Sequence, residues 1–420
     1  MHKVITSAAV ALAAMLAWAP APGLAQAAQP RLAPATTTAA AAAAAPPAAA
    51  STGRAASAPV AARRLPVLYL RAPLAASASR RDFILEGYPE PIARSRSNFD
   101  ADLKAAATGA ARFSDVPQYV IVEASRRWST ERVISVAFNG GSDAVLAQIA
   151  DVAQDWVRLS GAGLRFQFKD RQGRFLRWAA TDVLHAADIR IAFKTGRDDG
   201  GYWSLVGRES INATLVGGGP GQASMNLAGM DARLPTDWQT VVRHEFGHAL
   251  GFQHEHQSPA GGCDFRFDDD PGYVPELING RYQPNLNGKR PGLYTALSGL
   301  PNAWKVPEVD HNLRRLQNSR AYSIGPFDKQ SIMKYRFEAA MFLSGHNSPC
   351  FTDEGDNNSL SSQDIVGVRS AYPTDDGALA ALSRQGAAAA LALSSLPNAP
   401  ESVRNATQIQ RRALGMPSTR

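Results

Sequence analysis

The sequence predicts an α+β fold for residues 127–373, because segments with the pattern of strands are interspersed there with segments that have the period of a helix. Residues 133–138 and 188–193 are rich in β-branched and apolar residues and are typical of strands; the second alternates as a half-buried strand does. A further strand is expected over residues 222–227, after a run of three glycines. The order of these segments fits one domain.

Two helices accompany the predicted strands. The first has four apolar residues on one face, at intervals of four, three and four residues: Val145, Ile149, Val152 and Trp156. Ser142 precedes it and is a residue type that caps helix N-termini. The second helix is expected to begin near Asp237, since Asp237 or Thr236 is suited to cap it.

The first 27 residues are typical of a secretory signal peptide. His2 and Lys3 precede an apolar run over residues 4–18, and cleavage is expected after Ala27, with Ala25 nearly as suitable. The run is short and rich in alanine, and no other stretch is long and apolar enough to cross a bilayer. We therefore expect a secreted or periplasmic protein without stable membrane insertion.

Three further segments flank the predicted domain. Residues 28–64 are mostly alanine and proline, so a disordered linker is expected. Residues 65–126 are more mixed, and one interpretation is a structured N-terminal extension that stays attached; the alternative depends on the resemblance given below. Residues 374–420 return to an alanine-rich composition and are expected to form a weak helix or a mobile tail without chemistry of its own.

The chain has a formal net charge of +7, from arginines that are spread along the sequence. Nucleic-acid binding calls for a basic cluster with interleaved aromatic residues or for a recognisable module, and neither is present. We therefore expect no nucleic-acid partner, and we expect a monomer.

Residues 244–255, which read HEFGHALGFQHE, are the most informative segment. On a helix, His244 and His248 lie one turn apart on the same face, so both can bind one metal ion. Gly251 can adopt backbone angles closed to other residues, which lets the chain leave the helix and bring His254 to the same ion. Four of the eight histidines fall between residues 244 and 256, which argues against a chance pattern.

Three neutral imidazoles and one open position are typical of a catalytic zinc site, whereas a structural site uses four protein ligands and usually cysteines. Glu245 follows the first histidine and is expected to act as the general base of a hydrolytic reaction. The sequence thus predicts one catalytic Zn²⁺ held by His244, His248 and His254.

A second segment, residues 331–335, reads SIMKY. A lone methionine among apolar residues is usually core packing. Combined with the histidine segment, however, Met333 resembles the methionine of the turn beneath the zinc in the metzincin superfamily, and Glu255 makes the astacin family the closest resemblance. Further pieces match in the expected order: Arg127-Trp128-Ser129, residues 203–208, and residues 360–365 running on to Tyr372.

The resemblance implies a metzincin-type fold: a twisted, mostly parallel sheet with an antiparallel edge strand, two long helices, an active-site cleft and an irregular C-terminal subdomain with the methionine turn. It implies that residues 222–227 form the sheet edge, where a protein or peptide substrate would pair through main-chain hydrogen bonds. It implies that Tyr335 is a metal ligand or a transition-state hydrogen-bond donor, that Glu255 anchors a new N-terminus after activation, and that residues 65–126 include a propeptide.

Some residues depart from the astacin pattern. His256-Gln257-Ser258-Pro259 replace a segment that commonly holds an arginine and Asp-Arg-Asp, and Tyr202 replaces a disulfide cysteine of many members. Cys263 and Cys350 are the two cysteines of the chain, and in an exported protein this pair favours one disulfide; the alternative is two free thiols.

Acidic runs at residues 268–270 and 353–356 lack the alternating ligand order of a calcium loop, so solvated charge is favoured over calcium. The function expected is that of a secreted zinc-dependent endopeptidase with Glu245 as general base. Two alternatives remain open: a secreted zinc-containing binding or adhesion protein on the same fold, and a hydrolase of a non-peptide amide or ester.

Overall fold

The computed structural model describes residues 87–129, 132–196, 201–300, 302–316, 320–353 and 357–417. All of them belong to one unit, Ala76–Arg420. The predicted signal peptide, the predicted linker and residues 65–86 of the predicted propeptide or extension lie outside the described residues.

A five-stranded sheet has the order β2-β1-β3-β5-β4. Neighbouring strands run parallel except for β4, which pairs antiparallel with β5 at one edge. The five strands are β1 (Val133–Phe138), β2 (Arg165–Gln167), β3 (Ile189–Ala192), β4 (Tyr202–Ser204) and β5 (Met225–Leu227). The predicted fold class, α+β with a mostly parallel sheet and an antiparallel edge strand, is confirmed.

The edge strand itself is not the predicted one. Residues 222–227 contain β5, which lies between β3 and β4, so the antiparallel edge is formed by β4. The three residues of β4 are too few to show the alternation by which a strand is recognised in a sequence. Trp203 of β4 pairs with Asn226 of β5.

The strand β3 is buried along its whole length, although its alternating sequence predicted a half-buried strand. Arg190 is 0% exposed, and its guanidinium group donates hydrogen bonds to main-chain carbonyl oxygens. These oxygens belong to Ala187, Asp188, Ser210, Gly217 and Gln222. Burial lowers the pKa of Arg190 to about 10, yet the carbonyl oxygens replace water well enough for the side chain to cross the interior.

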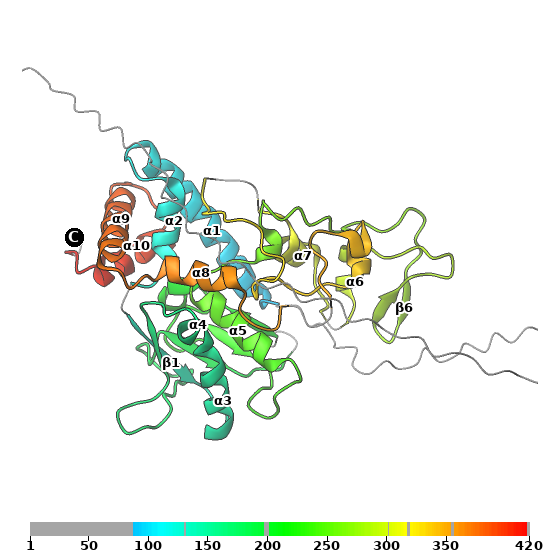
Figure 1. Ribbon diagram of the computed structural model, residues 1–420, viewed down its shortest axis with the longest axis horizontal. Helices are drawn as coiled ribbons and strands as arrows, with labels where there is room; N and C mark the ends of the chain where they lie inside the picture. Colours follow the sequence, from blue (N-terminus) through cyan, green and yellow to red (C-terminus); the bar gives the residue numbers. More distant parts are fainter. Residues whose placement is uncertain are drawn as a thin grey trace, which may run out of the picture. The chain divides into compact units, whose positions relative to one another are not determined.

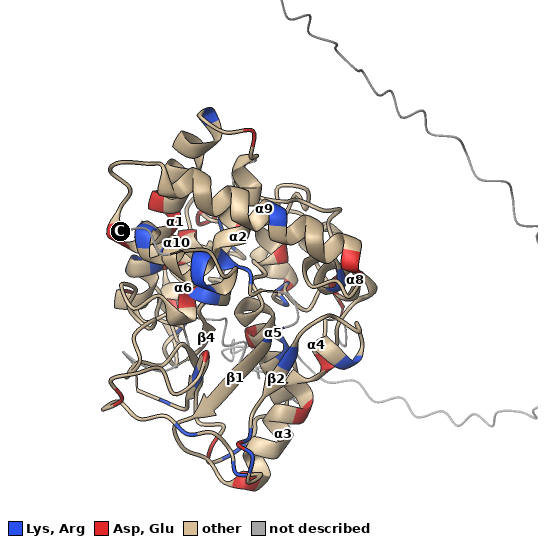
Figure 2. Cartoon of the chain, turned by 90° about the vertical axis from the view of Figure 1, so that its left-hand side faces the viewer, with Lys and Arg blue, Asp and Glu red and all other residues tan. Residues whose placement is uncertain are grey.

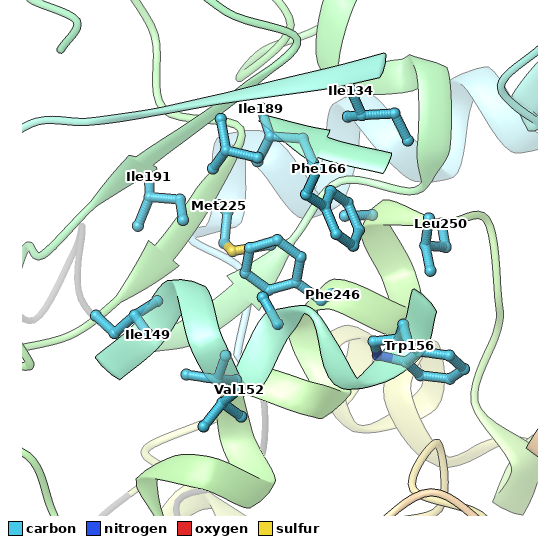
Figure 3. Close-up of a cluster of buried hydrophobic side chains, with 14 of the residues drawn as sticks. Ile134, Ile149, Val152, Trp156, Phe166, Ile189, Ile191, Met225, Phe246 and Leu250 are labelled. Carbon is cyan, nitrogen blue, oxygen red and sulfur yellow. The ribbon is translucent and has the colours of Figure 1, made fainter. Parts of the chain in front are cut away.

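Two helices complete the main core with the sheet. The N-cap of α3 (Asp143–Ala153) is Ser142, whose side chain accepts a hydrogen bond from the main-chain N–H of Val145. The short helix α4 (Asp155–Arg158) follows, and α5 (Trp238–Ala249) carries the first two histidines. Figure 3 shows side chains of α3, α4, α5 and the strands meeting in one buried cluster. Each fully buried large apolar side chain stabilises the fold by about 1.5–3 kcal/mol.

The part of the chain after α5 is irregular, as predicted. Its elements are η2 (Glu255–Gln257), the hairpin of β6 (Glu276–Ile278) and β7 (Arg281–Gln283), α6 (Leu293–Ser298), α7 (Val306–Leu313), η3 (Ala339–Met341), η4 (Gly345–Asn347) and α8 (Ser362–Ala371). It has a core of its own, which includes Phe265, Phe337 and Phe342. A disulfide joins Cys263 to Cys350 across this core, with 5.2 Å between the two Cα atoms.

Four helices near the two ends of the chain form a separate apolar cluster, here called the terminal helix cluster (Figure 1). They are α1 (Glu90–Arg112), α2 (Gln118–Arg126), α9 (Asp376–Ser394) and α10 (Glu401–Ala413). For residues 374–420 a weak helix or a mobile tail was expected, and the structure has two packed helices there, α9 and α10. Alanine methyl groups bury little area on an isolated helix, but they let neighbouring helices approach closely, and here the partners are supplied by the N-terminal helices. No helix within the described ranges is long and apolar enough to span a membrane.

Candidate metal centre

Three buried imidazoles converge at the C-terminal end of α5. The Nε2 atom of His248 lies 3.2 Å from Nε2 of His244 and 3.0 Å from Nε2 of His254. His244 and His248 are one turn apart on the helix, and His254 directly precedes η2. The three histidines that the sequence predicted as ligands therefore lie together in the structure. Among the described residues they form the single group of side chains suited to hold a metal ion.

Each of the three imidazoles is oriented through its other nitrogen. Nδ1 of His244 donates to the carbonyl of Ile332 (2.7 Å), and Nδ1 of His248 donates to the carbonyl of Phe252 (2.8 Å). Nδ1 of His254 donates to the side-chain oxygen of Gln257 (3.1 Å). Each acceptor requires the ring proton to be on Nδ1, so each Nε2 carries a lone pair. The three Nε2 lone pairs face one another.

These residues fit zinc. Donor atoms at the usual Zn–N distance and tetrahedral angle are roughly 3.3 Å apart, close to the observed separations. Neutral nitrogen atoms that each present a lone pair would repel at such distances, whereas a shared divalent cation accounts for their convergence. The donor set is three imidazoles without a cysteine, since both cysteines are in the disulfide.

The end of α5 is fixed by hydrogen bonds to its last carbonyl groups. The indole Nε1 of Trp128 donates to the carbonyl of Ala249 (2.8 Å), and the hydroxyl of Tyr372 donates to that of Leu250 (2.6 Å). Gly251 then has a φ of 103°, in the region that favours glycine, and the chain turns toward His254. Both anchors lie in segments that carried the family resemblance.

Met333 lies directly against α5. A Cβ atom added to Gly247 would come within 2.2 Å of the Met333 sulfur and 2.8 Å of Trp156 Cζ2, so only glycine allows this approach. The carboxylate of Asp364 on α8 accepts hydrogen bonds from the Ser331 hydroxyl and the Ile332 amide (2.6 and 2.8 Å). Asp364 thereby fixes the turn whose Ile332 carbonyl orients the first ligand.

Tyr335 lies beside the ligands, and its ring is 8% exposed. Its centroid is 5.2 Å from that of His244 and 4.6 Å from that of His254. It also stacks on His256, with 4.6 Å between the ring centroids and an interplanar angle of 30°. His256 accepts a hydrogen bond from the Tyr335 amide at Nδ1 and donates from Nε2 to the carbonyl of Asn312. Burial lowers the pKa of His256 well below its usual value, with His254 adding to the effect, so the ring is neutral.

Glu245 is 1% exposed and directly follows the first ligand. Tyr202 on the edge strand β4 lies within electrostatic range of this carboxylate: burial raises the pKa of Tyr202, and the charges of Asp237 and Glu245 raise it further. The charge of Glu245 is thus felt at the edge strand β4.

Glu255 lines a cavity of about 540 Å³ that also contains parts of α2 and α8. Its carboxylate accepts a hydrogen bond from the Asp328 amide, and its own amide donates to the Met333 carbonyl, both at 2.9 Å. Burial raises the pKa of Glu255 to about 7; the Asp328 amide opposes this rise, and the Asp328 and Asp364 carboxylates increase it. Through these two hydrogen bonds Glu255 links the segment that carries His254 to Asp328 and to the methionine turn.

Sequence reasoning did not assign roles to Gln257, His256 or Gly247. Gln257 was noted only as a departure from the family, yet its amide also donates to the carbonyls of His311 and Arg314 (2.8 and 3.0 Å), which fixes the oxygen that binds His254. The positions of His256 and Gln257 in the sequence could have indicated a role, because residues two and three places after a ligand on a tight turn can contact that ligand. For Gly247 the indication was its residue type, because a glycine inside a predicted helix often marks a close approach by another segment.

Protein donors bind two carboxylates of the first acidic run. Asp270 is bonded to Arg266 and Arg290. Asp269 accepts hydrogen bonds from the Gly292 amide and the Thr295 hydroxyl. These carboxylates are thus satisfied by protein donors, and residues 354–356 of the second run lie outside the described part of the chain.

Replacing Gly247 by alanine should destabilise the protein by about 1–3 kcal/mol, because the new methyl group forces Met333 and Trp156 to move. Thermal unfolding measures the effect. The matched control is Gly367→Ala on α8, where the nearest atom is Phe252 Cε1 at 3.7 Å and helix propensity favours alanine by about 1 kcal/mol. Equal melting temperatures for the two variants would contradict this account.

Replacing Gln257 by leucine should weaken zinc binding by about 10–100-fold, since His254 loses the acceptor that orients it. Competition with a chromophoric chelator measures the affinity. Gln253 lies in the same loop, and among the described residues its side chain makes no hydrogen bond to a ligand imidazole, so Gln253→Leu should bind zinc as tightly as the wild type. Unchanged affinity of Gln257→Leu would show that His254 is oriented by other contacts.

No protein-family model matches the sequence, and no curated protein matches it. Among solved structures, the chain is similar to two of myroilysin. One has 26% identity and a TM-score of 0.43 over 60% of this chain and 97% of the other. The second has 24% identity and a TM-score of 0.35 over 59% and 86%.

A third similar structure is high choriolytic enzyme 1, a hatching-enzyme zinc protease from Oryzias latipes (medaka fish), with 19% identity and a TM-score of 0.31 over 59% of this chain and 94% of the other. The three histidines on which the sequence resemblance to the astacin-like metzincins rests are the ones that the structure brings together.

Proposed function

We propose that the chain is a secreted zinc-dependent endopeptidase. The observation that supports this most directly is the convergence of three Nε2 atoms, with each Nδ1 bound to an acceptor, beside a buried glutamate. A three-imidazole set leaves one coordination position for water or substrate, as catalytic zinc sites do. A binding or adhesion protein would have no use for Glu245, which disfavours that alternative.

Bound zinc would lower the pKa of its water toward neutrality and polarise a substrate carbonyl. Glu245 would accept a proton from the attacking water and pass it to the leaving amine. Its burial strengthens both transfers, because a carboxylate that is 1% exposed has little competing solvent. The acceptors of the three Nδ1 protons hold the ligand imidazoles in one orientation, with each Nε2 directed toward the shared position.

Tyr335 would donate a hydrogen bond to the oxyanion that develops on the substrate carbonyl. Its ring packs between two ligand imidazoles and His256, so the hydroxyl has few orientations available. Such preorganisation is what makes an oxyanion donor effective, since little reorganisation is required during the reaction.

A peptide substrate would bind as an additional strand on β4. In the described chain the outward carbonyls of this strand already have donors. The Gly87 amide donates to the carbonyl of Tyr202 (3.2 Å), and the Tyr88 hydroxyl donates to that of Ser204 (2.6 Å). The Tyr88 ring also lies 6.1 Å from that of His311 on α7, whose main-chain carbonyl binds Gln257.

The segment at the start of α1 thus connects the edge strand to the helix behind the third ligand. We infer that residues 87–112 act as a propeptide that keeps the enzyme latent, because they occupy the hydrogen-bonding edge that a substrate needs. Export is supported by the disulfide, which is typical of proteins in oxidising compartments.

Replacing Glu245 by glutamine should keep bound zinc but lower kcat at least about 10²–10⁴-fold, because the amide cannot accept the proton. His248→Ala should lose both zinc and turnover. Metal analysis and hydrolysis of casein by processed protein measure the two properties. Proteolysis near the wild-type rate by Glu245→Gln would overturn the proposed function.

The same assay separates the alternatives. Cleavage of casein that stops on addition of a chelator and returns with zinc supports a peptidase. Hydrolysis of small esters or amides without cleavage of any protein substrate would favour the non-peptide hydrolase, and zinc binding without either activity would favour a binding protein.

Tyr335→Phe should lower kcat by about 10²–10³-fold with little change in KM, because the lost hydrogen bond forms only as the oxyanion develops. Steady-state kinetics on a short fluorogenic peptide measure both constants. A rise in KM at constant kcat would instead make Tyr335 a residue that binds the substrate ground state.

A further inference from the structure

The helices α9 and α10 take no part in the proposed peptidase chemistry, and yet they contact both N-terminal helices. We propose that α2, α9 and α10 together form a binding surface for α1, and that this surface retains α1 on the catalytic domain after the chain is cut between α1 and α2. The inference rests on the proposed function, because retention of α1 matters when Gly87 and Tyr88, which lead into it, cover the substrate edge of a peptidase.

The contact between α1 and this surface is apolar and combines alanines with larger aliphatic and aromatic side chains. Figure 2 shows α9 lying beside α1, α2 and α10, with charge at few of its positions. The residues of α1 in the cluster are Phe99, Leu103, Ala106, Ala107 and Ala110, all at most 8% exposed. Those of the receiving surface are Ile121, Val122 and Ala124 on α2, Ala389 and Leu393 on α9, and Val403 and Ala406 on α10.

A buried ion network adds specificity to this packing. The carboxylate of Glu209 is 2% exposed and binds Arg96 of α1 at 3.0 Å and Arg126 of α2 at 2.9 Å. Arg126 also binds Asp100 of α1 at 2.9 Å. Two charged residues of α1 therefore complement two on the remaining domain, and departure of α1 would leave Glu209 and Arg126 with fewer partners in a buried place.

The receiving surface is attached to the catalytic domain independently of α1. Asn212, which is 1% exposed and follows η1 (Gly207–Ile211), donates to the carbonyl of Ser402 on α10 at 3.0 Å. Its side-chain oxygen accepts from Asn405 of the same helix at 2.6 Å. Within the described residues α2 runs on toward β1, so it too stays with the domain when α1 is cut away.

The connection between α1 and α2 is accessible. It consists of residues 113–117, and the Phe113 side chain at its start is 87% exposed. Cleavage here would break the covalent link and leave the apolar contact and the ion network in place. A single cut would consequently not activate the enzyme; α1 would leave only when its contact with α9 and α10 is also lost.

The test uses the full chain with the recognition sequence of a site-specific protease inserted between Phe113 and Ser114, first in a Glu245→Gln background. After complete cleavage, the fragment that contains α1 should co-elute with the rest of the protein in size-exclusion chromatography. Leu393→Asp, which places a charge at a position that is 2% exposed, should release it. The matched control Leu391→Asp, at a position on the same helix that is 53% exposed, should retain it.

Leu393→Ala is the milder second variant, and its fragment should be lost at least tenfold faster than that of the control. Zinc content and circular dichroism show whether each catalytic domain is folded. Dissociation of the fragment from the cleaved chain with wild-type helices would overturn the proposal, as would equal retention in the Leu393 variants and the control.

This binding readout needs no turnover, so it is independent of the proposed function. In the active background, cleaved protein with wild-type helices should hydrolyse casein no faster than uncleaved protein, and cleaved Leu393→Asp should hydrolyse it at least tenfold faster. Retention of the fragment together with full activity would overturn the inhibitory part of the proposal. If the fragment binds as expected but no form of the protein is active, the result would count against the peptidase function alone.

Discussion

The convergence of three imidazole Nε2 atoms on one point is the constraint on which the rest of the structure depends. The acceptors that fix it come from three places: the turn after α5, the η2 segment and the distant methionine turn. The site can form only when the sheet-bearing part and the irregular part of the chain are both folded and packed on each other. Contacts far from the metal, such as those of Trp128, Tyr372 and Asp364, are therefore part of the site.

The same dependence explains the positions of residues without chemistry of their own. Gly247 is required because the Met333 sulfur lies against the helix that carries two ligands, and the Asp364 carboxylate fixes the turn that supplies the Ile332 carbonyl. The terminal helix cluster has a different proposed role, which is to hold α1, and with it the segment at the edge strand, rather than to set the geometry of the ligands. Catalysis and latency would thus use separate parts of one chain.

Local sequence patterns were sufficient to predict much of this architecture. The ligand spacing, Gly251, the capping Ser142 and the strands β1 and β3 follow from helix period, backbone freedom and alternation, which act over a few residues. Contacts between segments that lie far apart in the sequence could not be predicted. The sequence could not show that β4 rather than β5 forms the edge, or that Arg190 finds carbonyl oxygens inside the domain. Nor could it show that an alanine-rich tail packs against helices 250 or more residues away. The cost of burying a group depends on partners that other segments bring, and a local pattern does not contain them.

The most direct test of the central claim is X-ray absorption spectroscopy of the purified, zinc-loaded protein. The account predicts first-shell scattering from nitrogen and oxygen at about 2.0–2.1 Å, with the outer-shell pattern of three imidazole rings. A zinc shell with sulfur at about 2.3 Å, or with fewer than three imidazoles, would contradict it.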